Sequence, residues 1–349
     1  MWARVRTRDR ATTVRCVAKR RVGVLGTLVC DDIYGPAPDI TRSEGWGGIA
    51  YALSGLAAAL DDQWDIIPFI KVGADVVAEA RRWTSAIPRM AAHAQLVAVD
   101  APNNRSELRY VTTEVRTERM SGGVPGWTFA ELRDALDAAQ LDALYVNFLS
   151  GTEVDLTTMQ QVRAHFAGPI YVDLHMMLWE TDAVGRRALR PLKQAAAWCG
   201  CFDFIQLNED EMRMLAPDPG ALSVVATRAG AAATFVTLGS RGVHYHVRPA
   251  HPRWPAVHDV YRAQSLAEHA SIVTGVHAPT PVRDGAPVDP TGCGDVWGGT
   301  VFARLLAGDL PHVAMSAANR AASLNAESQG VTGLVDRLMT LRLTDARTG

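Results

Sequence analysis

The chain has 349 residues, which is enough for one large α/β domain with a small accessory piece. Apolar residues make up 48% of the chain, so it can bury a sizeable core, and its formal net charge of −2 gives no basis for binding nucleic acid or an anionic membrane. No apolar run approaches the roughly 20 residues that a membrane span needs. We therefore expect neither a nucleic-acid nor a membrane partner.

The cysteines are scattered and odd in number, which argues against a disulfide framework and fits a reducing compartment. They lie at positions 16, 30, 199, 201 and 293. We predict a cytoplasmic protein in which Cys199 and Cys201 are small core residues.

Residues 1–21 contain eight Arg or Lys residues and one Asp, without the apolar segment of a secretory signal. We predict a basic, disordered leader there, with an organelle transit peptide as the alternative, and expect the fold to begin near Val22.

Strand-like and helix-like segments follow one another through the first half of the chain. A Val- and Leu-rich strand is predicted over 21–33, a helix that opens with a glycine pair over 47–60, a strand over 64–73 and a helix over 74–86. The segment 107–120 has strand composition with alternating charge, which is typical of an exposed sheet rather than a buried core strand.

The second half alternates more regularly, which predicts a mainly parallel sheet with helices on both faces. Its predicted strands cover 141–149, 169–176, 202–208, 232–239 and 242–247. Its predicted helices cover 152–167, 185–199 and 209–216. The segment 248–287 is rich in Pro and His and has no clear period, so we expect a long loop there.

The stretch "VDPTGCGDVWGG" (288–299) places two glycines around a cysteine, then an acid, and then a predicted helix that ends at Gly308. Exposed N–H groups at a helix N-terminus favour an anion. In phosphoryl transfer these groups would hold the moving phosphoryl group, and Asp295 would take the proton of the attacking hydroxyl. The alternative is an ordinary Gly-rich turn with Asp295 in the first helical turn.

Other marked residues also follow predicted strands, and ligands gather at the carboxyl ends of strands in α/β sheets. Asp31 and Asp32 follow the first strand, Asn208 follows "FIQL", and Gly239 follows "FVTL".

Five elements together resemble the ribokinase-like, or PfkB, family of carbohydrate and nucleoside kinases, over roughly residues 22–335. "DPTGCGD" (289–295) is similar to the family's D-T-x-G-A-G-D signature, "NEDE" (208–211) to its N-x-x-E, and "TLGSRG" (237–242) to its T-x-G-x-x-G nucleotide loop. "GWGG" (45–48) is similar to its N-terminal glycine pair, and "KVGAD" (71–75) to its V-G-x-D.

The resemblance implies an α/β fold, a ribokinase-like three-layer α/β/α sandwich with a mainly parallel central sheet and a small β lid. The kinase domain would cover 22–340, with lid pieces near 33–44 and 107–120 and the 248–287 loop within it. The implied activity is an ATP-dependent transfer of the γ-phosphoryl group to a hydroxymethyl group of a sugar or sugar-like small molecule.

The resemblance also assigns roles to residues of this chain. Catalysis would use Asp295 as the base, with the anion hole formed by Gly292, Cys293 and Gly294. ATP would be bound by Asn208, Glu211, Thr237, Gly239, Gly242 and Asn319. Mg²⁺ would be held, largely through water, by Asn208 and Glu211, and a monovalent cation such as K⁺ by Asp289 and Thr291. The acceptor would contact Asp31, Gly47 and Gly48, with Asp32 competing for the role of Asp31.

Departures from the family pattern concern the acceptor half of the site. The Asn that often follows the glycine pair is absent from "GGIAYALS" (47–54), and the D-x-N-x-R element becomes "DLHMM" (173–177). Cys293 replaces the usual Ala. A nucleoside or vitamin-type acceptor therefore stays open, as does a non-catalytic relative that binds a sugar or nucleoside.

Two further expectations follow. A dinucleotide-dependent oxidoreductase would need G-x-G-x-x-G after the first strand, and "GVLGTLVC" (23–30) lacks it. The exposed edge of the lid predicts a homodimer, because free strand edges seek partners.

Overall fold

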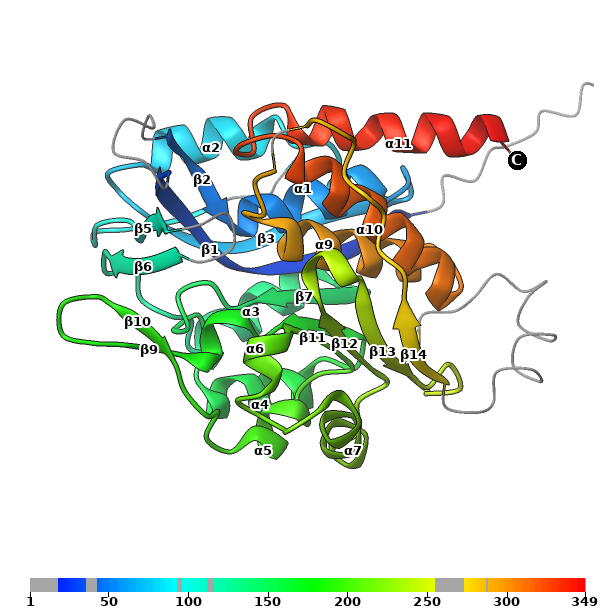
Figure 1. Cartoon of the computed structure of the whole chain (residues 1–349). Coiled ribbons are helices and arrows are strands. Elements are labelled where there is room, and N and C mark those ends of the chain that lie inside the picture. The colour runs from blue at the N-terminus through cyan, green and yellow to red at the C-terminus, as the bar shows by residue number, and fades with distance from the viewer. Residues whose placement is uncertain are drawn as a thin grey trace, which may run out of the picture.

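The computed structural model describes residues 18–35, 43–92, 96–111, 116–254, 273–286 and 288–348 (Figure 1). Most of the predicted leader lies outside these ranges. The first strand, β1 (Arg20–Tyr34), begins two residues before the expected start at Val22. At the other end, the last helix, α11 (Leu334–Thr348), continues past residue 340.

The central sheet runs in the order β14-β13-β12-β11-β8-β7-β1-β3-β4. All of its neighbouring pairs are parallel except β12–β13 and β13–β14, which are antiparallel. The strands of this sheet besides β1 are β3 (Trp64–Gly73), β4 (Val97–Val99), β7 (Ala143–Asn147), β8 (Ile170–Asp173), β11 (Phe204–Asn208), β12 (Ala233–Thr237), β13 (Val243–Val247) and β14 (Val273–His277). The middle strands read as continuous apolar runs because both of their faces are covered.

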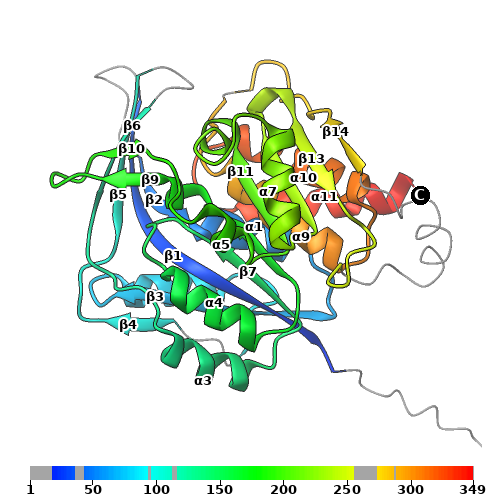
Figure 2. The ribbon, with the colours of Figure 1, turned by 90° about the horizontal axis from the view of Figure 1, so that it is seen from below.

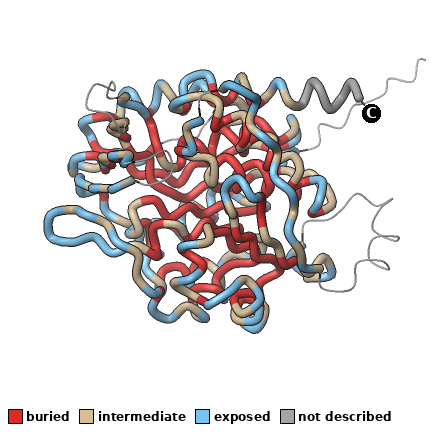
Figure 3. The backbone as a smooth tube through the Cα atoms, viewed as in Figure 1, coloured by how far each residue is buried: buried red, intermediate tan, exposed pale blue. Residues whose placement is uncertain are grey.

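Helices cover both faces of the sheet, and each face has its own hydrophobic cluster (Figures 1 and 2). The first face carries α1 (Ile49–Ala59), α2 (Val77–Ser85), α9 (Cys293–Leu306), α10 (Pro311–Ala326) and α11. The second face carries α3 (Phe129–Ala139), α4 (Leu156–His165), α5 (Ala195–Cys199), α6 (Glu209–Met212) and α7 (Pro219–Ala229). Buried residues follow the sheet and the inner sides of these helices (Figure 3).

Helices α1 and α9 pack closely because glycines lie at their contact. A Cβ at Gly55 would lie 2.6 Å from Val296 O, and a Cβ at Gly299 would lie 2.3 Å from Ala52 O. All eleven residues of α1 are buried as a result of its place between the sheet and its neighbours. This packing fixes the N-terminus of α9 against the carboxyl end of the sheet.

A small second sheet forms the lid. The later part of β1 pairs antiparallel with β2 (Ser43–Gly48) and parallel with β5 (Arg105–Tyr110), and β5 pairs antiparallel with β6 (Arg116–Ser121). The predicted lid strand over 107–120 is therefore two strands. Of the other predicted lid piece, residues 36–42 lie outside the described residues.

The helix predicted over 185–199 is wrong for most of its length. Its first part is a hairpin of β9 (Trp179–Thr181) and β10 (Arg187–Leu189), and only α5 is helical. Pro191 prevents a continuous helix because it lacks the N–H that a helix interior needs. The hairpin lies against the lid, where Met120 N–H donates to Gly185 O at 2.9 Å.

Several elements were not predicted, among them the helices α3 and α7 and the strand β14. Helix α3 begins at a capping box of Thr128 and Glu131, and α7 begins with the Asp218 cap followed by proline, so both start signals were present in the sequence. Strand β14 lies in the segment 248–287, which is therefore not loop throughout. Residues 255–272 and 287 of that segment are outside the described part.

Candidate active site

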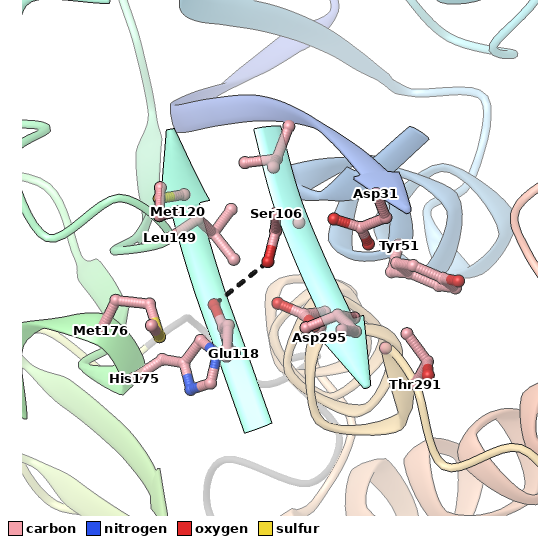
Figure 4. A pocket seen from close by; sticks show the side chains of 14 residues that line it. Asp31, Tyr51, Ser106, Glu118, Met120, Leu149, His175, Met176, Thr291 and Asp295 are labelled. Carbon is pink, nitrogen blue, oxygen red and sulfur yellow. Dashed lines mark hydrogen bonds between the residues drawn. The ribbon is translucent and has the colours of Figure 1, made fainter. Parts of the chain in front are cut away.

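A pocket lies between the inner face of the lid and the N-terminus of α9 (Figure 4). The lid supplies Asp31 from β1, Ser106 from β5 and Glu118 from β6. The body supplies Asp295 and its neighbours from α9, and His175 from the turn η1 (His175–Leu178) after β8. The pocket thus lies at the carboxyl ends of the parallel strands, as the sequence predicted.

Asp295 lies in the first turn of α9 and faces the pocket. Asn147, at the end of β7, is fully buried, and its Nδ2–H donates to Asp295 Oδ1 at 2.6 Å. This hydrogen bond orients the carboxylate while it stays at the pocket wall. The position suits a general base for a hydroxyl bound under the lid.

Gly292 has a φ of 73° and precedes the first residue of α9. A Cβ there would come within 2.2 Å of the ring of Tyr51, which is 2% exposed. No described side chain caps this 14-residue helix, although the Cys293 N–H donates to Pro290 O at 3.2 Å. A helix N-terminus without a side-chain cap can hold an anion. Glycine is therefore required at 292 by both conformation and space.

The carbonyl group of Gly294 is fixed by two side chains that are hydrogen-bonded to each other. Gln206 Nε2–H donates to Gly294 O at 2.8 Å, and Tyr171 O–H donates to Gln206 Oε1 at 2.6 Å. The first turn of α9 is thus fixed by contacts to strands β8 and β11.

The Cys293 side chain points away from the pocket, toward α10. Asn325 Nδ2–H donates to Cys293 Sγ at 3.3 Å, and the thiol donates to Ala322 O at 3.4 Å. Burial, together with nearby Asp289 and Asp295, raises the pKa of the Cys293 thiol to about 11. Of the three predicted anion-hole residues, Cys293 therefore directs its side chain away from the pocket, and its role there stays a prediction.

Asp31 lines the pocket and is 8% exposed. Because side chains alternate along a strand, Asp32 faces the other side of the lid, and of the two acids Asp31 is the one that lines the pocket. A Cβ at Gly47 would lie 1.8 Å from Asp31 Oδ2, so glycine lets the carboxylate lie against β2. Gly48, with a φ of 59°, lines the pocket and precedes α1.

Glu118 lines the pocket, and the sequence singled out neither this residue nor its partner Arg187, which lies behind the lining. Glu118 Oε1 accepts from Arg187 Nη1–H at 2.7 Å and from Ser106 Oγ–H at 3.2 Å. Arg187 comes from β10, and its side chain is 1% exposed. Period-two alternation in 107–120 was a signal for Glu118, whereas nothing local indicated Arg187.

His175 is paired with Glu211, the two side-chain atoms lying 2.7 Å apart. Burial alone would lower the pKa of His175, but the Glu211 carboxylate outweighs it and raises the pKa to about 9. Burial alone would raise the pKa of Glu211, but His175 outweighs it and lowers that pKa. The pair is therefore ionised at neutral pH.

Asn208 and Glu211 form a capping box at the start of α6. Glu211 Oε2 accepts from Asn208 N–H and Asn208 Oδ1 accepts from Glu211 N–H, both at 2.9 Å. With its other oxygen on His175 and no exposed surface, Glu211 is not placed to bind Mg²⁺ directly, and the predicted role of Asn208 and Glu211 through water stays a prediction. Within the described ranges, no three His, Cys, Asp or Glu residues form a metal-binding group.

The residues expected to hold a monovalent cation are joined to each other and to the protein. Asp289 Oδ1 accepts from Thr291 N–H at 2.9 Å, and Thr291 O accepts from Asn325 Nδ2–H at 2.8 Å. Thr291 Oγ1 is hydrogen-bonded to Tyr110 O–H of the lid at 2.7 Å. Thr291 thus joins the lid to the body, and its role toward K⁺ stays a prediction.

The predicted nucleotide residues lie at the ends of β11 and β12, where Thr237 pairs in register with Asn208. Gly239 has a φ of 59° and open space where a side chain would start, whereas a Cβ at Gly242 would lie 2.2 Å from His277 O. The turn can therefore approach a ligand at Gly239.

Asn319 is 7% exposed and makes protein contacts with both ends of its amide. Its Oδ1 accepts from Trp297 Nε1–H at 2.7 Å, and its Nδ2–H donates to Ala278 O at 2.5 Å. Asn319 therefore joins α10 to α9 and to the chain after β14.

No family model and no curated protein sequence matches this chain. No helix in the described ranges is long and apolar enough to cross a membrane.

Solved structures resemble the chain over most of its length. A pyrophosphate-dependent kinase in the ribokinase family, in a sulfate complex, matches with a TM-score of 0.66 at 12% identity, covering 88% of this chain and 96% of its own. A Burkholderia thailandensis nucleoside kinase in complex with inosine matches with a TM-score of 0.65 at 14% identity, covering 93% and 97%. An Arabidopsis thaliana ribokinase complexed with ribose and ATP matches with a TM-score of 0.64 at 14% identity, covering 94% and 99%.

Identities this low show the fold alone. The predicted α/β sandwich with a mainly parallel sheet and a small β lid is confirmed, and the chain has the ribokinase-like fold.

Proposed function

We propose that this protein is a kinase that transfers the γ-phosphoryl group of ATP to a hydroxymethyl group of a sugar or sugar-like small molecule. One observation carries the proposal: a carboxylate, Asp295, and an uncapped helix N-terminus at Gly292 face the same pocket, opposite a second carboxylate, Asp31, from a lid. An acid beside an anion site is unfavourable unless the acid accepts a proton during phosphoryl transfer.

In this mechanism the acceptor lies under the lid with a hydroxyl group at Asp295. Asp31 accepts a hydrogen bond from another hydroxyl and orients the acceptor. Asp295, held by Asn147, takes the proton as the hydroxyl attacks. The N–H groups that follow Gly292 stabilise the charge that develops on the phosphoryl oxygens.

The lid excludes water, which would compete with the acceptor. The contacts that hold it to the body include Tyr110 to Thr291 and Glu118 to Arg187. Since the second contact lies at the pocket wall, lid closure and acceptor binding involve the same residues.

Pyrophosphate is a second candidate donor, favoured by the hydrogen bonds that the Asn319 side chain makes within the protein. The side chain expected to line an adenine pocket is already hydrogen-bonded to Trp297 and Ala278. A structural neighbour is described as a pyrophosphate-dependent kinase. Pyrophosphate has no adenine, so as a donor it would need only the phosphate-binding part of the site.

A nucleoside or vitamin-type acceptor, or a binding protein without turnover, remains the alternative on the acceptor side. A test mixes the protein with MgATP or MgPPi and a panel of sugars, cyclic polyols, nucleosides and hydroxymethyl vitamins, and follows the phosphomonoester product by phosphorus NMR. We expect a product with a neutral sugar or polyol. Acceptor binding without product from either donor would support the non-catalytic alternative and contradict the proposal.

A further inference from the structure

The pleat of the lid strands selects which lid side chains reach the pocket. Ser106 and Leu108 of β5 line it together with Glu118 and Met120 of β6, and β5–β6 register pairs Ser106 with Met120 and Leu108 with Glu118. Glu107, the residue between Ser106 and Leu108, faces the other side. Glu118 is therefore directed at the acceptor by the same alternation that directs Asp31.

Glu118 is held firmly in this position. Arg187 donates to its Oε1 at 2.7 Å, and the Arg187 Nη2 group also donates to Ser150 O at 3.1 Å. The Glu118 side chain is 11% exposed and that of Arg187 is 1% exposed. A buried arginine with several acceptors has little freedom, so the carboxylate is oriented before any ligand binds.

The charge around the pocket favours hydroxyl donors over anions. Asp31, Glu118 and Asp295 all line it, and ionised carboxylates only accept hydrogen bonds. Among the described lining residues His175 is the one basic side chain, and it is paired with Glu211. An acceptor with a carboxylate or phosphate would be repelled, whereas one rich in hydroxyls would donate further hydrogen bonds to these oxygens, each of which can accept more than one.

We propose that Glu118 is a specificity-determining residue that selects neutral polyhydroxylated acceptors, such as cyclic polyols and unmodified sugars, over their anionic derivatives. Asp31 and Glu118, which lie to either side of Ser106 in Figure 4, bind two hydroxyls and leave a third at Asp295. Arg187 is the positioning residue for Glu118. The inference rests on the proposed kinase function for the identity of the acceptor.

The test measures acceptor binding by calorimetry in an Asp295→Asn background, which removes turnover. The probes are myo-inositol, D-ribose, and the matched pair D-glucose and D-glucuronate. Glu118→Gln should weaken binding of the neutral probes by about tenfold or more, because a hydrogen bond to a charged group is lost. It should also narrow the preference for D-glucose over D-glucuronate, because a negative charge is removed.

Glu107→Gln is the matched control, since Glu107 lies on the outer face of the lid and pairs with Arg109. It should leave every affinity unchanged. Arg187→Lys keeps the charge but loses the forked geometry, so in the otherwise wild-type enzyme it should raise the KM for the acceptor more than it lowers kcat.

Three results would overturn the inference: Glu118→Gln affinities within about twofold of the parent, equal or tighter binding of D-glucuronate, or no binding of any neutral probe. These outcomes are separate from failure of the kinase proposal. If neutral probes bind and Glu118→Gln weakens them, but wild type makes no product from either donor, the specificity role stands and the kinase function fails.

Discussion

Gly292 shows how one residue sets the geometry of the proposed phosphoryl site. Its φ of 73° and its contact with the Tyr51 ring leave no room for a Cβ. We expect Gly292→Ala to lower the free energy of unfolding by about 2–4 kcal/mol, from overpacking and a strained backbone together. Urea denaturation measures this change. Gly285→Ala is the control, because its φ is also positive, at 75°, but nothing lies within 4 Å of its Cβ position. A loss of stability as large in the control would show that the Tyr51 contact contributes nothing.

Cys293 should behave as a packing residue despite its place in the predicted anion hole. Its thiol faces Ala322 and Asn325, and its pKa is raised to about 11. At pH 8 the reactive thiolate is therefore scarce. We expect Cys293→Ala to keep phosphoryl transfer within about threefold of wild type, since a small buried side chain is replaced by another.

Iodoacetamide labelling followed by mass spectrometry checks the same point. Cys293 should label slowly at pH 8 in the native protein and rapidly after unfolding. Fast native labelling together with inactivation would place the thiol in the pocket and contradict its assignment.

The His175–Glu211 pair makes a pH-dependent contribution to stability. The charged groups around His175 are Glu211, Asp173 and Asp295. Because the folded pKa of His175, about 9, lies above the unfolded value of ~6.5, its contribution is fully present below about pH 6.5 and is lost as the pH rises through about 9. The pH dependence from Glu211 has the opposite sign. Because its folded pKa is lowered, its contribution to stability is present above the usual pKa range of Glu and is lost on acidification.

The measurement compares the free energy of unfolding of wild type and His175→Gln between pH 6 and pH 9.5. The advantage of wild type should shrink as the pH rises across this range. A constant difference would mean that the ion pair does not titrate with folding.

Single residues differed in how far the sequence could predict them. Asp31 and Asp295 could be singled out because one lies near the end of a predicted strand and the other at the start of a predicted helix, and both line the pocket. Their roles stay predictions. The N-x-x-E pattern of Asn208 and Glu211 fits both a capping box and a metal role, and only the coordinates show that both Glu211 oxygens have protein partners. The partner of Glu118 lies 69 residues away on an unpredicted hairpin, so no local pattern could reveal it.

At the scale of elements, the lid is the part whose closure can be tested. Tyr110, at the end of β5, is hydrogen-bonded to Thr291 at 2.7 Å. Tyr110→Phe removes that bond, which should raise the KM for the acceptor about two- to tenfold with little change in kcat. Tyr34→Phe is the control, because the ring that contacts the Arg109 guanidinium is retained. Equal effects of the two variants would show that the Tyr110 contact does not hold the lid.

Elements with a strong period or a simple composition were predicted well. The Val- and Ile-rich strands β1 and β3 and the helix α9 lie where the pattern placed them. The hairpin β9–β10 was missed because short strands with polar residues have weak patterns, and their pairing depends on contact with the lid. Helix α3 was missed although its capping box was visible in the sequence.

At the scale of the whole molecule, we predict a homodimer formed through the lid. The outer edge of β6 is partly covered by the β9–β10 hairpin, because the backbones of Arg119 and Arg186 form an isolated antiparallel β-bridge. Strand pairing between two copies would therefore use the β2 edge of the lid. Light scattering coupled to size-exclusion chromatography should give twice the mass of 37.7 kDa. A monomer mass at concentrations well above those of the activity assays would contradict this prediction.

The overall architecture was predictable because alternating strands and helices leave few topologies, and because the order of the motifs resembles that of a family whose fold the solved structures share. The acceptor could not be predicted in the same way. Its pocket combines side chains from β1, β6, α9 and the turn after β8, whose distances depend on how the lid meets the body.

The most direct test of the central claim is the rate of phosphoryl transfer by wild type and Asp295→Asn, with the best donor and acceptor from the panel. Asp134→Asn, which changes an exposed carboxylate on α3, is the matched control. We predict that Asp295→Asn lowers kcat by about 10²–10⁴-fold while acceptor binding and the control rate stay unchanged. A rate for Asp295→Asn equal to that of wild type would contradict the assignment of Asp295 as the base and the mechanism built on it.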